Sequence, residues 1–178
     1  MAYAVLGRTG LQVSRVGGGG IGQVWGPTTA AECVRTLHRA LELGVNFFDV
    51  APAYGQGKAE EVLGRALHGR QEPVVIATKV RLAAQEMHDV AGAVRTSVEA
   101  SLRRLRRETV DVLHVHNRFT PRRGDLPHSL SADDALGSVL DAYRQMQHTR
   151  KTRFIGISAM EPDVPTVRHI MTSGHWGE

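Results

Sequence analysis

Five short segments that favour β-strands alternate with segments that favour amphipathic helices, and this alternation most constrains how the chain can fold. The clearest strand is Val74–Thr78, a continuous apolar run without polar alternation. Runs of this kind are buried on both faces, as in a parallel sheet covered by helices. The regular repeats predict an α/β fold with the helices outside the sheet. The other predicted strands cover residues 17–22, 45–50, 110–116 and 154–158.

The predicted helices carry recognisable start and stop signals. Thr29 and Glu32 have the spacing of a capping box, and Gly44 has the position of a helix stop. A β-hairpin built from residues 3–6 and 11–14 precedes the first strand of the repeats. The remaining helices are expected at residues 59–68 and 94–105, as one continuous helix that begins at Ser131 with Leu136, Leu140 and Tyr143 inward, and between Pro162 and Gly174.

Composition fits one domain over residues 1–178, because 42% hydrophobic and 22% charged residues are ordinary globular values. The formal net charge of +4 is a modest excess that suits an anionic dinucleotide and does not argue for nucleic-acid binding. We expect the basic run at residues 103–107 to be a solvated helix face, and the lone Cys33 to be a packing residue. No apolar run approaches the roughly 20 residues of a membrane span, and the N-terminus lacks a signal-peptide pattern. We therefore expect a cytoplasmic protein that binds neither membrane nor nucleic acid.

Side chains suited to proton transfer follow three of the predicted strands. Asp49 ends one strand and Tyr54 lies in the loop after it, while Lys79 and His116 end the next two strands. Two parallel architectures compete here, an open doubly wound sheet and a (β/α) barrel. The glycine cluster at residues 17–22 lacks the order and setting of a dinucleotide fingerprint, which disfavours the open sheet. Chemical groups on three strand ends favour the barrel, whose sites gather at the carboxyl ends of its strands.

Four segments resemble the aldo-keto reductase family. Residues 6–14 resemble the opening hairpin of the family, and residues 46–55 resemble its second strand. Residues 77–79 resemble the end of its third strand, and residues 110–116 resemble its fourth strand. The histidine of the family lies five positions after the aspartate of the last segment, which selects His116 over His114. His114 lies on the same side of its strand, one layer deeper, as a packed or hydrogen-bonded residue. The resemblance implies a TIM-type (β/α) barrel.

The resemblance also implies a reaction, in which NADPH gives a hydride to an aldehyde or ketone and the protein gives a proton to the oxygen. Tyr54 is then the expected proton donor. A free phenol has a pKa near 10, poorly matched to neutral pH, and a nearby ammonium such as that of Lys79 favours the phenolate. Asp49 is expected to hold Lys79 charged and in place, and His116 to orient and polarise the carbonyl group.

Further residues are expected to hold the two reactants. The glycine-rich strand leaves room for a ligand near the backbone, so Gly20 and Ile21 are assigned to the cofactor together with Asp49 and Ser158. Ala159 follows Ser158 where the family commonly has asparagine for the nicotinamide carboxamide, which weakens the expected grip on the cofactor. Substrate walls are expected at Trp25 and at Asn117, the first residue of a long polar loop that ends at residue 130.

Alternatives remain open at this stage. His114 and His116 form an HxH pair that could ligate a metal, but no third ligand has a convincing spacing, so no metal is assigned. A closed barrel needs eight strands and about 250 residues, whereas the resemblance covers only about five strand–helix units. The open edges then require cover from a longer polypeptide, a second chain or another copy. The alternative function is that of a truncated, non-catalytic relative that acts in binding or assembly.

Overall fold

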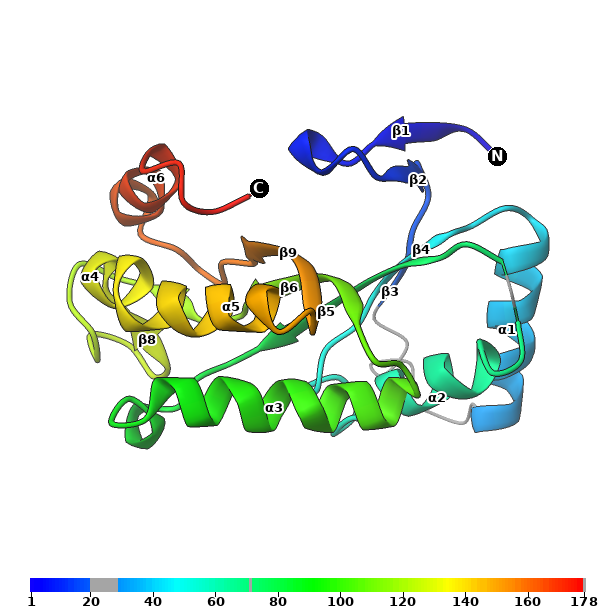
Figure 1. The fold of residues 1–178 in the computed structure, drawn as a ribbon, viewed down its shortest axis with the longest axis horizontal. Helices are drawn as coiled ribbons and strands as arrows, with labels where there is room; N and C mark the ends of the chain where they lie inside the picture. Colours follow the sequence, from blue (N-terminus) through cyan, green and yellow to red (C-terminus); the bar gives the residue numbers. More distant parts are fainter. Residues whose placement is uncertain (20–28, 71, 178) are drawn as a thin grey trace. The chain divides into compact units, whose positions relative to one another are not determined.

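The computed structural model describes residues 1–19, 29–70 and 72–177 (Figure 1). In chain order, the strands are β1 (Tyr3–Val5), β2 (Gln12–Ser14), β3 (Gly18–Gly19), β4 (Phe47–Asp49), β5 (Val75–Val80), β6 (Val110–Val115), β7 (Arg118–Phe119), β8 (Ser129–Leu130) and β9 (Thr152–Ile157). The α-helices are α1 (Ala30–Glu42), α2 (Lys58–Ala66), α3 (Val90–Leu105), α4 (Ala132–Leu136), α5 (Ser138–His148) and α6 (Val164–Thr172). Short 3₁₀ helices cover Gly7–Thr9 and Ala84–Glu86.

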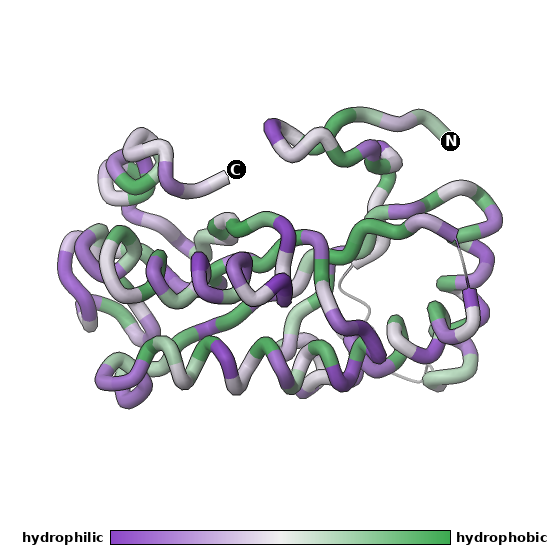
Figure 2. Tube along the Cα trace, in the orientation of Figure 1, coloured by the Kyte–Doolittle hydropathy of each residue, from purple (hydrophilic) through white to green (hydrophobic). Residues whose placement is uncertain are grey.

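The main sheet has five strands in the order β3-β4-β5-β6-β9. Strand β4 pairs in parallel with β3 on one side and with β5 on the other. The expected hairpin is present as the antiparallel pair β1–β2, and the long polar loop contains a second small parallel pair, β7–β8. The strand–helix alternation predicted from the sequence is thus confirmed, and Figure 2 shows the hydrophobic colour along the strands of the sheet.

The described chain divides into two compact units. The first contains Met1–Thr78 and Glu99–Val112, and the second contains Lys79–Val98 and the residues from Leu113 onward. The division falls within β5, α3 and β6. In the part of the chain that the structure describes, no helix is both long enough and apolar enough to cross a membrane.

In the first unit, helix starts and helix contacts follow from a few local interactions. The predicted capping box begins α1, because the Thr29 hydroxyl accepts from the Glu32 amide and the Glu32 carboxylate accepts from the Thr29 amide. Helices α1 and α2 pack on each other, and Cys33 is buried as expected. Gly64 of α2 faces the end of α3, where an added Cβ would lie 2.8 Å from the carbonyl carbon of Leu105. A larger residue at this position would separate the two helices.

The described part of the glycine-rich segment forms a strand at Gly18–Gly19, as predicted, but the missing side chains at these two positions have a different use. A Cβ at Gly18 would lie 2.8 Å from the Phe48 ring, and one at Gly19 would lie 2.9 Å from the carbonyl oxygen of Asp49. The missing side chains therefore let β4 approach β3 closely. Whether Gly20 and Ile21 leave space for a ligand falls outside the described residues.

In the second unit, the prediction of one continuous helix from Ser131 is wrong. Ser131 does cap a helix, in a capping box with Asp134, but the helix ends at Gly137 and a new one begins beside it. Gly137 has a non-helical backbone (φ −100°, ψ −118°), and an added Cβ would lie 2.8 Å from the Asp133 carbonyl oxygen. The break leaves Leu136 half-buried, whereas Leu140 and Tyr143 lie in the core as expected.

Helix α6 begins at a titratable cap. The hydroxyl and the backbone amide of Thr166 both donate to the Asp163 carboxylate, at 2.7 and 2.9 Å, and these hydrogen bonds hold the pKa of Asp163 below its ordinary value of 3.8. The charged form is therefore favoured in the folded helix. Its stabilising effect is present above the ordinary value and is lost as pH falls through the lowered value.

We predict that the start of α6 loses protection in acid. In NMR hydrogen exchange, the protection factor of the Thr166 amide should fall in the native protein as pH is lowered through the acidic range below the ordinary Asp163 value of 3.8. Asp163→Asn keeps a good capping acceptor that does not titrate in this range, so its Thr166 amide should show a much smaller change. Equal acid sensitivity in both proteins would contradict this assignment.

Candidate functional site

The first unit carries two of the four predicted proton-transfer residues. Asp49 is the last residue of β4, which hydrogen bonds hold in register with β5: the Val75 amide donates to Asn46 and the Val50 amide donates to Ala77, at 2.7 and 3.0 Å. The chain then turns, and the Tyr54 amide donates to the Ala51 carbonyl oxygen at 3.0 Å. Asp49 and Tyr54 are both half-buried, so the acid and the phenol retain some access to solvent.

The second unit carries Lys79, His116 and Ser158 on three neighbouring strands. The His116 amide donates to the Val80 carbonyl oxygen at 2.8 Å, and the Ser158 amide donates to the Val115 carbonyl oxygen at 2.9 Å. The three residues therefore lie at the carboxyl ends of β5, β6 and β9, side by side. Lys79 is 2% exposed and His116 is 8% exposed, which is unusual burial for a lysine in particular.

The direction of the Lys79 side chain follows from its neighbour. Thr78 donates its hydroxyl hydrogen to the Glu60 carboxylate of α2 at 2.6 Å, so Thr78 faces the helix layer. Successive residues of a strand point to opposite faces, and Lys79 consequently points away from that layer. In a (β/α) barrel this opposite face is the interior.

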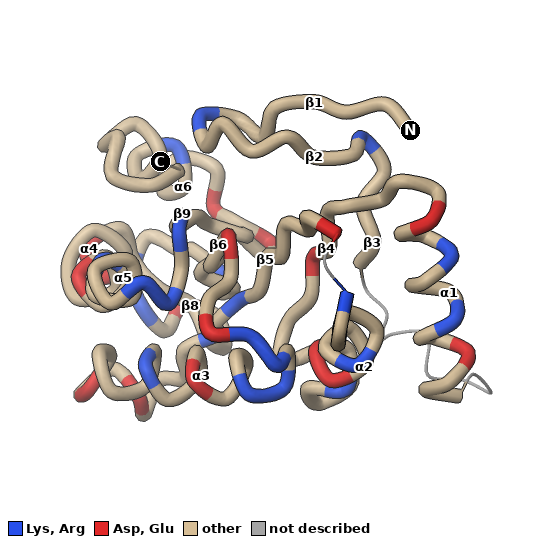
Figure 3. Tube along the Cα trace, turned by 45° about the vertical axis from the view of Figure 1, so that its right-hand side comes forward, with Lys and Arg blue, Asp and Glu red and all other residues tan. Residues whose placement is uncertain are grey.

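Glu60 is fully buried and was not among the residues predicted from the sequence. Its carboxylate accepts from Thr78 and also from Nε of Arg104, each at 2.6 Å. The expectation of a solvated basic face is therefore wrong at Arg104, although Arg103 and Arg106 are exposed as expected. Figure 3 shows acidic residues on α2 and basic residues where α3 ends. One signal was present in the sequence: Glu60 shares the helical spacing of the buried Leu63 and Leu67.

The other two tyrosines of the chain are poor candidates for a proton donor. Tyr3 lies on the hairpin and donates to the Gly44 carbonyl oxygen. Tyr143 is fully buried against Trp176 and donates to the His114 carbonyl oxygen at 3.1 Å. Burial raises the pKa of Tyr143 well above its ordinary value, so it keeps its proton at neutral pH. Tyr54 is the phenol that follows a strand of the main sheet.

The structure gives Asn117 a role in holding loops together. It is fully buried, its carbonyl oxygen accepts from the Leu82 amide at 3.0 Å, and its amide group donates to the carbonyl oxygens of Leu82 and His128 at 2.8 and 2.9 Å. A direct contact with substrate stays a prediction for this residue. The predicted ligand contacts of Gly20, Ile21 and Trp25 lie outside the described residues.

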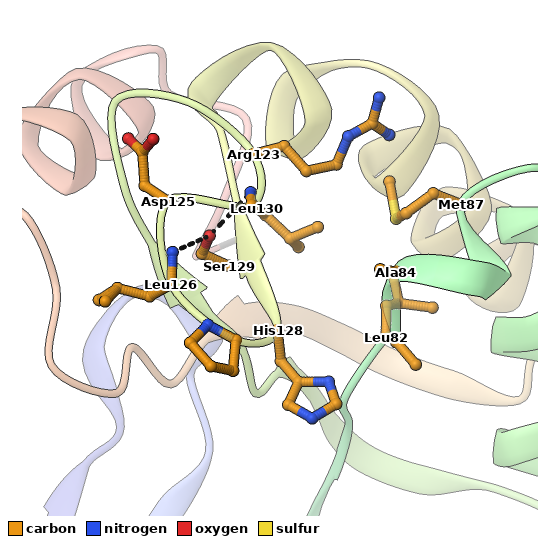
Figure 4. Close-up of a pocket in the computed structure, with 12 residues that line it drawn as sticks. Leu82, Ala84, Met87, Arg123, Asp125, Leu126, His128, Ser129 and Leu130 are labelled. Carbon is orange, nitrogen blue, oxygen red and sulfur yellow. Dashed lines mark hydrogen bonds between the residues drawn. The ribbon is translucent and has the colours of Figure 1, made fainter.

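The loops that Asn117 joins enclose a cavity of about 320 Å³ (Figure 4). It is lined by residues 82–84 and Met87 of the segment that follows β5, and by residues 123–130 of the long polar loop. The Ser129 hydroxyl accepts from the amides of Gly124 and Leu126 and so shapes this half of the loop. None of the four proton-transfer residues is among those that line the cavity. In the described ranges, no three His, Cys, Asp or Glu side chains are grouped as a metal site would require.

The known proteins that resemble this chain in sequence and in structure include several aldo-keto reductases. A sequence model of the Aldo/keto reductase family matches residues 15–174. L-galactose dehydrogenase from Arabidopsis thaliana is 37% identical over 166 residues, covering 90% of this chain and 49% of that protein. Aldo-keto reductases from Bacillus halodurans (TM-score 0.76, 26% identity, covering 97% of this chain and 54% of that chain) and from Klebsiella pneumoniae (TM-score 0.74, 23% identity, covering 99% and 57%) are similar in structure. The Klebsiella protein was solved with NADP and acetate.

These likenesses confirm the predicted α/β class and (β/α)-barrel type, with five parallel strands in the described chain. The chain spans about half the length of the curated relatives it matches, such as 49% of the plant dehydrogenase. The barrel that it forms by itself is therefore incomplete, as the strand number predicts.

We predict that Asn117→Ala lowers the free energy of unfolding by about 3 kcal/mol, because it leaves buried amide and carbonyl groups of the backbone without their partner. Urea unfolding of the two proteins measures this difference. Gln85→Ala, an exposed change in the neighbouring segment, should alter stability by less than about 0.5 kcal/mol. If both variants were equally stable, Asn117 would not join the two loops in solution.

Proposed function

This chain belongs to the aldo/keto reductase family, and on that premise we propose that it carries the catalytic residues of an NADPH-dependent carbonyl reductase. In the proposed reaction, the cofactor supplies a hydride to the carbonyl carbon of an aldehyde or ketone. The phenol of Tyr54 gives a proton to the carbonyl oxygen, and the product is an alcohol. The phenolate that remains regains its proton from solvent, so one carbonyl consumes one hydride and one proton.

One observation carries the proposal: an acid, a phenol, an amine and an imidazole lie at or just after the carboxyl ends of three successive strands of a parallel sheet. Asp49 and Tyr54 follow β4, Lys79 lies at the end of β5, and His116 comes directly after β6. Parallel strands place their carboxyl ends at one edge of a sheet, where the sites of (β/α) proteins form. Such a set of groups on one sheet edge suits proton transfer to a bound oxygen atom.

Each side chain has a proposed part in that transfer. The Lys79 ammonium stabilises the negative charge that develops on the phenol oxygen, and the Asp49 carboxylate keeps this ammonium charged and oriented. His116 donates a hydrogen bond to the substrate oxygen and so stabilises the charge that develops there. The strong burial of Lys79 and His116 supports this arrangement, because hydrogen bonds and charges act more strongly where water is excluded.

The cofactor assignment rests on the family and on the position of Ser158. This half-buried residue lies at the carboxyl end of β9, and its backbone is hydrogen-bonded to the strand that carries His116. A hydroxyl group can both donate and accept, which suits a carboxamide group. Ala159 adds no polar side chain beside it. We therefore propose that Ser158 contacts the nicotinamide end of NADPH, while the remaining grip comes from parts of a longer or assembled barrel.

We predict that Tyr54→Phe lowers kcat for carbonyl reduction by about 100-fold or more, because general acid catalysis contributes about 10²–10⁴-fold. The NADPH dissociation constant, measured by cofactor fluorescence, should change by less than about twofold, because in the proposed reaction the hydroxyl group acts on the substrate oxygen and not on the cofactor. Tyr3→Phe is the matched control: it removes a phenol hydroxyl from the hairpin and should leave turnover unchanged.

Other outcomes favour the second function, that of a non-catalytic relative that acts in binding or assembly. Saturable NADPH binding without turnover of any carbonyl compound would support it. Turnover that is insensitive to Tyr54→Phe would contradict the proposed proton donor.

The outer strands of the sheet lead to a proposal about assembly. In the described chain β3 and β9 are the first and last strands of the order, so each pairs on one side only. Unpaired strand edges promote association. We propose that a longer polypeptide, a second chain or another copy supplies the missing strands. If another copy supplies these strands, the isolated 178-residue chain should sediment as a dimer or larger species. A stable, folded monomer would contradict self-association.

A further inference from the structure

Glu60 presents a buried carboxylate that accepts a hydrogen bond on each of its two oxygens. Its side chain is 0% exposed, and its two oxygens accept from Thr78 and Arg104 at 2.6 Å each. The Arg104 side chain is 25% exposed and also donates to the Ser101 hydroxyl at 3.2 Å. A buried ion pair contributes little net stability, because desolvation opposes the attraction between the charges. A contribution to stability therefore does not explain why the Glu60–Arg104 ion pair is buried at this position.

Arg104 also packs against the start of α2. Gly57 is the N-cap residue of this helix and has a positive φ of 88°. A Cβ at Gly57 would lie 2.8 Å from Cδ and 2.9 Å from Nε of Arg104. The arginine side chain therefore crosses the backbone at the helix start, and glycine is needed there both for the backbone conformation and for the space.

The start of α2 is in turn bonded to the turn that presents Tyr54. The Ala59 amide donates to the Tyr54 carbonyl oxygen at 3.3 Å, and the Lys58 amide donates to the Gly55 carbonyl oxygen at 3.2 Å. On its other side, Glu60 holds Thr78, which directly precedes Lys79 in β5. One carboxylate thus connects the segment of the phenol with the strand of the amine.

We infer that the Glu60–Arg104 pair positions Tyr54 for proton transfer, by fixing the 54–58 turn against the strand that carries Lys79. This inference rests on the proposed function. Glu60 and Arg104 are positioning residues: they act through the backbone of the turn and through Thr78, and they contact neither substrate nor cofactor in the proposed reaction. A shift of about 1 Å in a reacting group can cost about 100-fold in rate.

Two variants test the pair by different routes. Glu60→Gln keeps the size of the side chain but removes its charge, which weakens the bond from Arg104. Gly57→Ala leaves Glu60 in place but forces Arg104 away from it. Gly69→Ala is the matched control, because Gly69 also has a positive φ (72°) while an added Cβ meets nothing within 4 Å. It imposes similar backbone strain without touching the ion pair.

The measurements are kcat and KM for a carbonyl substrate, the NADPH dissociation constant and the thermal midpoint of each variant. We expect Glu60→Gln and Gly57→Ala to lower kcat per folded molecule by about tenfold or more, with the NADPH dissociation constant changed by less than about threefold. Gly69→Ala should lower the thermal midpoint and leave kcat within about twofold of the native value. If Glu60→Gln fails to fold, the comparison of kcat between Gly57→Ala and Gly69→Ala still tests the positioning role of the ion pair.

The outcomes separate this inference from the proposed function. Turnover that depends on Tyr54 but is unchanged in folded Glu60→Gln and Gly57→Ala would overturn the inference alone and leave the pair a purely structural role. Equal losses of kcat in Gly57→Ala and Gly69→Ala would also overturn the inference. Backbone strain alone, without displacement of Arg104, would then be enough to lower kcat. Turnover that is unaffected by Tyr54→Phe would overturn the proposed function, and the positioning role with it.

Discussion

The parallel pairing of β4, β5 and β6 is the constraint on which the candidate site depends. In the first unit, backbone hydrogen bonds join β4 to β5, and the Asp111 side chain of β6 accepts from the Ile76 amide of β5 at 2.9 Å. In the second unit, the same two strands remain joined where His116 donates to Val80. Parallel strands need a crossover after each one, so every strand of the repeat ends at the same edge and a loop begins there. The proposed site requires the polar residues that follow these strands to meet at that edge.

Much of the strand and helix arrangement could be predicted, because strand and helix formation depend on local sequence. The buried run in β5 and the Thr29–Glu32 capping box specify their elements by themselves, and both were confirmed. The positions of Lys79 and His116 at strand ends follow directly from the strand boundaries. By contrast, the break at Gly137 depends on a close approach to the Asp133 carbonyl oxygen, and helical spacing on either side of a glycine gives no sign of it.

The role of Arg104 shows the general limit of such prediction. Its neighbours Arg103 and Arg106 are exposed, and the sequence presents the run as uniform. What distinguishes Arg104 is a buried carboxylate 44 positions away in the chain. Long-range polar pairing has no periodic signature, whereas apolar burial has one, so the core can be predicted and its internal ion pairs cannot. Asn117 is a similar case, because its partners Leu82 and His128 contribute backbone groups that carry no sequence signal.

Asn117 and Glu60 are buried polar residues whose hydrogen bonds fix neighbouring segments, each within its own unit of the chain. Loops that follow strands carry backbone amide and carbonyl groups that must be hydrogen-bonded once they leave water. Asn117 satisfies such groups between the loops after β5 and β6, and Glu60 binds the hydroxyl group of the residue before Lys79. A fully satisfied polar network of this kind specifies one geometry, whereas apolar contacts tolerate several. Directional bonds of this kind hold the segments beside Tyr54 in one unit and beside His116 in the other, as the proposed proton transfer between fixed groups would require.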